Sequence, residues 1–171
     1  MNDYTDLFYS LMAVAIFSFF LLHANGAILS NQARTVDHEY EKTAISVAQS
    51  IIDEAKTLEF DWAIIDGVTP DEFPGEFLGF DERGGSDREN FAVFDDYHFY
   101  NQNPLIVPTE LGNYTVRITV DFVEVEEVSG VTVVSAPSGT TSFNKRMTVT
   151  ASNIANDDFA TLTYIKSYFP M

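Results

Sequence analysis

The side chains that could do chemistry are mostly acidic, with three histidines among them. Asp95 and Asp96 are adjacent, and His98 follows two positions later. Ca²⁺ prefers a shell of several oxygen ligands, and this cluster lacks the ligand spacing of a known metal motif. Asp95 and Asp96 are therefore a weak Ca²⁺ candidate, and a solvated acidic turn is the simpler interpretation. We expect no cofactor and no other metal site.

No pattern brings together a serine, a histidine and an acid, as nucleophilic catalysis would require. The sequence has no cysteine, which excludes disulfides, thiolate metal sites and cysteine nucleophiles. We therefore expect a protein that is not an enzyme. Asn113-Tyr114-Thr115 matches the N-glycosylation sequon at the start of a predicted strand, so Asn113 is a candidate modification site.

The composition limits the partners. The 171 residues are 46% apolar, which argues against a disordered acidic tail, and 26 Asp and Glu against 9 Lys and Arg give a net charge of −17. Nucleic acid would repel such a chain, so we expect no nucleic-acid partner. The length suits one domain, or one domain with a long appendage.

A long uncharged run lies near the N-terminus, from Leu7 to Leu29. As a helix it would reach roughly 35 Å, enough to cross a hydrocarbon core of about 30 Å. A cleaved signal peptide is the alternative, but the preceding residues are acidic, whereas a secretory signal begins with a basic segment. We expect residues 7–29 to lie in a membrane or in a bundle of apolar helices. His23 is expected at an interface, with a proton-sensitive group as the alternative.

Apolar residues then recur at spacings of three and four. They are Val36, Tyr40, Ala44, Val47, Ile51, Ala55 and Leu58. This spacing predicts one face of an amphipathic helix. No proline occurs before Pro70, so a single helix is expected from about Tyr4 to Leu58. Because glycine lowers helix stability by about 1 kcal/mol relative to alanine, Asn25 and Gly26 predict a kink or an unwound stretch at His23–Ala27.

The rest of the sequence predicts a loop and then a sheet. Residues 59–112 are rich in glycine, proline and acids, which are loop signals, with phenylalanines that should hold the loop down. From Tyr114 to Phe122 apolar and polar residues alternate, which predicts a half-buried strand, and a phase slip after Phe122 predicts a bulge. Further strands are expected at about 131–135, 147–151 and 159–168, joined by short turns and therefore antiparallel.

These elements predict an α+β fold, with a long N-terminal helix packed on a C-terminal antiparallel sheet. The apolar half of the helix should occupy residues 1–33 and the globular domain residues 34–171. Within that domain we expect the amphipathic half of the helix at 34–58, the loop at 59–112 and the sheet at 113–171.

The order of several segments resembles type IV pilins and the pseudopilins of type II secretion. SVAQSIIDEAKTLEFD (Ser46–Asp61) is similar to the distal half of the family's long first helix. The segments that follow it in the same order are FDDYHFY (Phe94–Tyr100), GNYTVRITVDFVEVEE, KRMTVTASN and ATLTYI. As an architecture, the resemblance covers most of the chain.

The resemblance implies a structural subunit of an extracellular filament, with a pool held in the membrane through residues 7–29 before assembly. Its implied partners are copies of itself and an inner-membrane assembly machinery, and the sheet domain would lie outside the cell. The side chains expected to pack between copies are Leu7, Phe8, Leu11, Val14, Ile16, Phe17, Phe20 and Leu21.

The start of the chain departs from the family pattern. The family has a short basic leader and a glutamate at the fifth mature position, whereas here the start is acidic and Thr5 stands at position five. We expect Asp3 or Asp6 to take the place of that glutamate by pairing with the N-terminal amine of a neighbouring copy.

Two other functions stay open. One is a single-span membrane protein that carries an outward sensor or adaptor domain. The other is a pseudopilin that works in a secretion machine.

Overall fold

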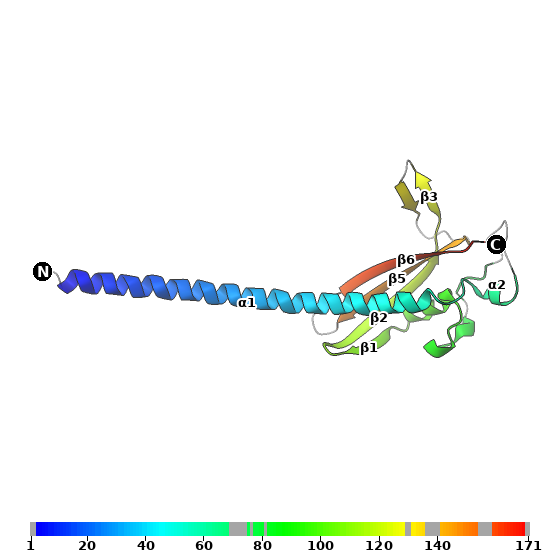
Figure 1. Cartoon of the computed structure of the whole chain (residues 1–171). Coiled ribbons are helices and arrows are strands. Elements are labelled where there is room, and N and C mark those ends of the chain that lie inside the picture. Colours follow the sequence, from blue (N-terminus) through cyan, green and yellow to red (C-terminus); the bar gives the residue numbers. More distant parts are fainter. Residues whose placement is uncertain are drawn as a thin grey trace. The chain divides into compact units, whose positions relative to one another are not determined.

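The computed structural model of the chain describes residues 3–68, 75, 77–80, 82–128, 131–135, 141–153 and 159–169 (Figure 1). These residues form two compact units, one that extends to Glu39 and one that begins at Tyr40. The first unit is helical throughout its described part, and the second contains helix and sheet.

The predicted long helix is present as α1 (Asp3–Ala55), and both units contribute to it. Residues 23–27 are helical, so the structure does not show the unwound stretch expected there. Helix formation is cooperative, and the cost of a single glycine, about 1 kcal/mol, does not outweigh the flanking helical turns. Asn25 and Gly26 are both exposed within the chain.

The second unit contains a four-stranded antiparallel sheet in the order β1-β2-β5-β6. Its strands are β1 (Leu105–Thr109), β2 (Gly112–Phe122), β5 (Asn144–Asn153) and β6 (Phe159–Ser167). Between β2 and β5 the chain forms a separate pair, β3 (Val125–Val128) with β4 (Val131–Val134). The strands expected after Gly112 are thus confirmed in type and order.

The end of α1 closes the core of the sheet. Its buried residues are spaced as one helical face, and they are Ala44, Val47, Ala48, Ile51, Ile52 and Ala55. They pack with the inward side chains of β2 and β5, which are Tyr114, Val116, Ile118, Val120, Met147, Val149 and Ala151. The Tyr114 hydroxyl donates a 3.0 Å hydrogen bond to the Tyr40 carbonyl. The α+β prediction, a helix packed on an antiparallel sheet, is confirmed.

Several short helices lie in the described part of the segment between α1 and β1. They are α2 (Trp62–Ile65), η2 (Glu82–Gly84), η3 (Arg88–Asn90) and η4 (Phe94–Asn101), the last three being 3₁₀ helices. The aromatic side chains Phe77, Phe91, Phe94, Tyr97 and Tyr100 are buried, so the described part of this segment packs down as expected.

Two details differ from the prediction. Strand β1 lies inside the range expected as a loop. It was not predicted because it is short and contains Pro108, which weakens the strand signal. The phase slip after Phe122 marks the end of β2 and not a bulge. Val123 is fully buried beyond it, and its N–H donates to the Asn144 carbonyl over 2.9 Å.

Candidate functional site

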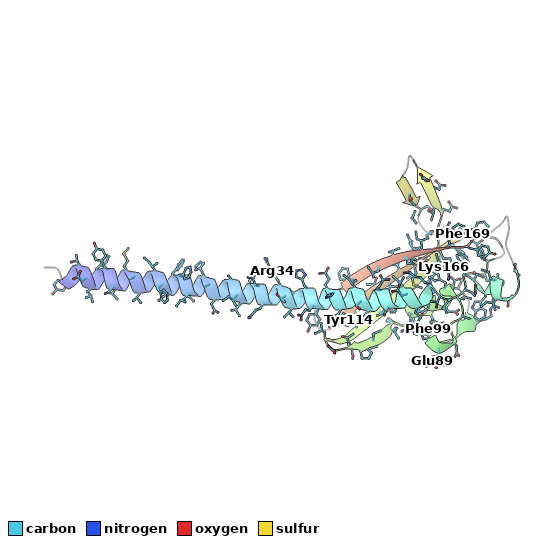
Figure 2. All side chains as sticks on the ribbon, in the orientation of Figure 1. Arg34, Glu89, Phe99, Tyr114, Lys166 and Phe169 are labelled. Atoms are coloured by element: carbon cyan, nitrogen blue, oxygen red, sulfur yellow. The ribbon has the colours of Figure 1, made fainter. Side chains whose placement is uncertain are left out.

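The first unit presents large apolar side chains to its surroundings. All eight side chains expected to pack between copies are exposed, from 51% for Leu21 to 67% for Phe20. Figure 2 shows the side chains of this part of α1 standing out above and below the ribbon. We call these eight residues the apolar surface. They are Leu7, Phe8, Leu11, Val14, Ile16, Phe17, Phe20 and Leu21.

The apolar surface extends around the helix. Leu7, Val14 and Leu21 are seven residues apart and share one side, whereas Ile16 lies about half a turn away from Leu7. A helix that is apolar on every side is stable only when it is buried in protein or in lipid. The described residues of the chain bury none of the most apolar window of this helix.

Two polar side chains within the apolar run bond to their own helix. Ser10 Oγ donates to the Leu7 carbonyl over 2.8 Å. His23 Nδ1 lies 3.1 Å from the Phe19 carbonyl, and the two rings are 4.3 Å apart. Such bonds satisfy polar atoms without water, as an apolar environment requires. Among the described residues, α1 is the one helix long and apolar enough to cross a membrane.

The acidic residues at the start of α1 are placed only in part. Asp6 is exposed within the chain. Asp3 begins α1, but its side chain lies outside the described part of the structure. Their expected pairing with a neighbouring copy stays a prediction.

The interpretation of Asp95 and Asp96 as a solvated acidic turn is wrong, because both side chains are buried. Asp96 Oδ2 accepts the N–H groups of Ala92 and Val93 at 2.8 and 3.0 Å. Its Oδ1 accepts from Trp62 Nε1 at 3.0 Å. Asp96 therefore holds the start of η4 against α2.

Asp95 faces the ammonium group of a buried lysine, Lys145 on β5. Lys145 Nζ also donates to Asp61 Oδ2 over 2.6 Å and to the Phe60 carbonyl over 2.9 Å. A cation thus already lies where Ca²⁺ was considered. The described residues contain no group of three or more His, Cys, Asp or Glu side chains suited to a metal ion.

Asp61 is the residue that caps α2. Its Oδ1 accepts the N–H groups of Ala63 and Leu78 at 2.9 and 3.1 Å, and its Oδ2 accepts the N–H of Gly79 at 3.1 Å. The rings of Phe60 and Phe122 lie 4.5 and 4.7 Å from Lys145 Nζ. We call Lys145, Asp61 and Asp95 the buried lysine cluster.

The pKa values of the two carboxyl groups of the cluster are shifted in opposite directions. The pKa of Asp95 is raised to about 7, because burial and the neighbouring Asp61 together outweigh the lowering by Lys145. Burial alone would also raise the pKa of Asp61. There, however, the Lys145 ammonium and the N–H groups of Ala63 and Leu78 outweigh burial, so the pKa lies below its ordinary value. Below about pH 7, the cluster therefore holds a neutral Asp95 beside Lys145 and Asp61.

His98 and Asn113 lie apart from this cluster. His98 Nδ1 is 3.0 Å from the Val120 nitrogen, so the histidine ties η4 to β2. A cavity of about 300 Å³ lies beside it, lined in part by Phe80 and Ser86. Asn113 is exposed near the start of β2, and its glycosylation stays a prediction.

Lys145 and Asp61 were not predicted from the sequence as site residues, although one signal was available. Lys145 occupies the same alternating phase as Met147, Val149 and Ala151, which face the core. A lysine in that phase requires an acidic partner in the core.

No protein-family model matches the chain, and no curated protein and no solved structure is significantly similar to it.

Proposed function

We propose that this chain is a structural subunit of an extracellular type IV pilus-like filament that polymerises through its N-terminal helix. The observation that carries the proposal is the exposed apolar surface, which the described part of the chain leaves uncovered. Burying apolar area contributes about 25 cal/mol per Å². Association with other apolar helices therefore supplies the driving force for assembly.

The fold supports the same function. A long N-terminal helix that is apolar at first and then packs on an antiparallel sheet is compatible with the architecture of a pilin. The length of the apolar run also suits storage in a membrane before assembly. In this proposal, the N-terminus begins on the cytoplasmic side, and the assembly machinery of the inner membrane extracts the subunit into the filament.

The first experiment is electron microscopy of material sheared from the cell surface, combined with mass spectrometry of the chain's N-terminus. Filaments composed mainly of this chain would support the proposal. Recovery of the chain as a monomer in the membrane fraction, with none in the sheared fraction, would contradict it.

A paired substitution separates filament packing from membrane anchoring. Phe17→Ala with Phe20→Ala leaves the run apolar, so insertion into the membrane should persist, but it removes two large side chains from the proposed contacts between copies. We expect sheared filaments to be lost at an unchanged level in the membrane. Val125→Ala, at an exposed position of β3, is the matched control and should leave filaments intact.

Asp3 and Asp6 provide a prediction about the register between copies. If their carboxylates pair with a neighbour's N-terminal amine, Asp3→Asn with Asp6→Asn should reduce filament yield without reducing the membrane pool, because only the charge is removed. Filament counts per cell and quantitative blots of the membrane fraction measure the two quantities. Normal filaments from the double variant would exclude the pairing.

A second candidate is a single-span membrane protein with an outward sensor or adaptor domain. The same apolar helix favours it, since one helix of this length suffices to span a bilayer. For this function, the Phe17→Ala and Phe20→Ala variant should behave as the unmodified chain does in every fraction.

A further inference from the structure

The buried lysine cluster brings an amine and two carboxyl groups together where water is excluded. The side chain of Lys145 is 1% exposed, that of Asp61 is fully buried, and that of Asp95 is 4% exposed. Aromatic rings of Phe60, Phe77 and Phe122 lie within 6 Å of Nζ. An amine fixed against a carboxyl group in such a site can condense to an amide, because proximity replaces a bimolecular encounter and dry surroundings disfavour hydrolysis.

We propose that Lys145 and Asp61 join through an intramolecular isopeptide bond between Nζ and Cγ, with Asp95 as the group that transfers protons. The bond would form within the folded chain, with the release of one water molecule and without a cofactor. This inference does not depend on the proposed filament.

The environment of Asp61 suits it to be the acylating group. Its Oδ1 already accepts N–H groups from Ala63 and Leu78, and these donors would stabilise the negative charge that develops on that oxygen when Nζ adds to Cγ. Its Oδ2, 2.6 Å from Nζ, is then the oxygen that leaves. No such pair of backbone donors was found on Asp95 among the described residues.

Asp95 is suited to proton transfer because it contacts Lys145 and interacts with Asp61. Its carboxyl group is protonated below about pH 7, since burial raises its pKa to about that value. General acid–base groups of this kind work best when their pKa lies near the working pH. The two carboxyl groups thus have distinct roles set by their surroundings.

The condensation needs no co-reactant. The Lys145 ammonium first passes one proton to Asp61 Oδ2, which gives a neutral amine and a neutral carboxyl group. Nζ adds to Cγ, Asp95 protonates the departing hydroxyl group, and water leaves as the C–Oδ2 bond breaks. Asp95 then takes a proton from the nitrogen, so it ends protonated as it began, and no electron is gained or lost.

The bond would connect the segment that follows α1 to the strand β5, across 84 residues of sequence. In a chain without cysteine it would supply the covalent connection that a disulfide supplies elsewhere. It would close the core at the place where the helix ends.

The decisive experiment is the intact mass of the full chain, purified in detergent and then denatured for mass spectrometry. We expect a mass lower than that of the sequence by one water molecule. Proteolysis should release a branched peptide in which the Lys145 segment is attached to the Asp61 segment. A chain with the full mass of its sequence would overturn the proposal, and so would a branch at Asp95.

Two variants test the roles. Asp61→Asn offers an amide in place of the acid, so condensation would release ammonia, and the mass should be lower than that variant's sequence by one ammonia molecule. This positive signature does not depend on loss of folding. Asp95→Asn retains both reacting groups but should slow the step by about 10²-fold or more, so the freshly purified chain should keep its full mass.

Lys166→Met is the matched control. Lys166 on β6 lies opposite Lys145 in the sheet register, but its Nζ donates to backbone carbonyls of Lys56 and Leu58. This variant should lack one water molecule, as the unmodified chain does. A full mass in this control, or absence of the ammonia signature in Asp61→Asn, would contradict the assignment of Lys145 and Asp61.

Discussion

Asp95 is a buried carboxyl group whose protonation differs between the folded and unfolded chain. Burial raises the pKa of Asp95 in the folded chain from the ordinary value of 3.8 to about 7, and the side chain is 4% exposed beside Lys145 and Asp61. Between these two values the folded chain binds the proton and the unfolded chain releases it. The contribution of Asp95 to stability is therefore fully present below about pH 4 and is lost as the pH rises towards about 7.

Asp95→Asn should remove this dependence. Asparagine keeps the shape of the side chain and a hydrogen-bond donor, but it does not titrate. The free energy of unfolding of the variant should therefore not fall between about pH 4 and pH 7 through loss of this proton. Thermal unfolding of both chains from pH 4 to pH 8 measures the difference between their free energies of unfolding. Repulsion among the other acidic residues affects both chains alike, so it largely cancels in that difference. Parallel curves for the two chains would show that Asp95 is not the titrating group.

Gly84 lies against the carboxylate of Asp96. A Cβ at this position would be 2.5 Å from Asp96 Cγ and 2.6 Å from its Oδ1. Asp96 cannot move away without giving up its bonds to Ala92, Val93 and Trp62.

Gly84→Ala should therefore destabilise the second unit by about 1–3 kcal/mol, the usual cost of overpacking. Ser86→Ala, at an exposed position nearby, is the control and should be nearly neutral. Chemical denaturation monitored by Trp62 fluorescence measures both. Equal midpoints for the two variants would contradict the predicted clash.

For individual side chains, the sequence predicted little of the buried lysine cluster. Asp61, Asp95 and Lys145 are far apart in the chain, and their meeting depends on how α2, η4 and β5 pack. The pair Asp95-Asp96 was noticed, but adjacency alone does not reveal burial. Tertiary packing, which local spacing does not encode, decides whether such a pair is solvated or buried.

The elements were far more predictable, because each long element has its own period. The spacing of three and four from Tyr40 to Ala55 identified the helix face, and alternation identified β2 and β5. The 3₁₀ helices were missed, since they are short and lack a hydrophobic period. β1 was missed because Pro108 interrupts a strand of five residues.

A substitution at Gly26 tests whether the low helix propensity at this position of α1 is needed for the proposed assembly. Apart from the adjacent residues and the backbone of the helix itself, no atom of the described residues lies within 4 Å of a Cβ at this position, so alanine fits without a clash. Gly26→Ala should stabilise the helix by about 1 kcal/mol.

If the chain forms the proposed filament with α1 helical throughout, Gly26→Ala filaments should form normally, and helical content by circular dichroism should be equal or higher. If assembly requires the helix to unwind at Asn25 and Gly26, filament yield should fall while the helical content rises. Asn25→Ala should shift both quantities in the same direction as Gly26→Ala.

The net charge of the chain would oppose the proposed assembly of copies. The chain has a net charge of −17, so copies brought together repel one another unless ions screen them. Screening shortens the Debye length from about 30 Å at 0.01 M salt to about 8 Å at 0.15 M.

Self-association of the purified chain should therefore strengthen as the salt concentration is raised from about 0.01 M to about 0.15 M. Sedimentation of the assembled fraction measures it at each ionic strength. Glu126→Gln with Glu127→Gln removes two exposed negative charges from β3 and should weaken the dependence on salt. Association that weakens as salt is added would indicate instead that paired charges hold the copies together.

The order of strands in the sheet has a consequence for how copies can aggregate. β1 and β6 are its two edges. Pro108 removes a backbone donor from the β1 edge, which hinders the addition of another strand there. The β6 edge has no proline between Phe159 and Ser167 and remains able to pair. Pairing of two β6 edges would stop at two copies, because each joined sheet would end in a blocked β1 edge, so the sheet does not lend itself to amyloid-like ribbons.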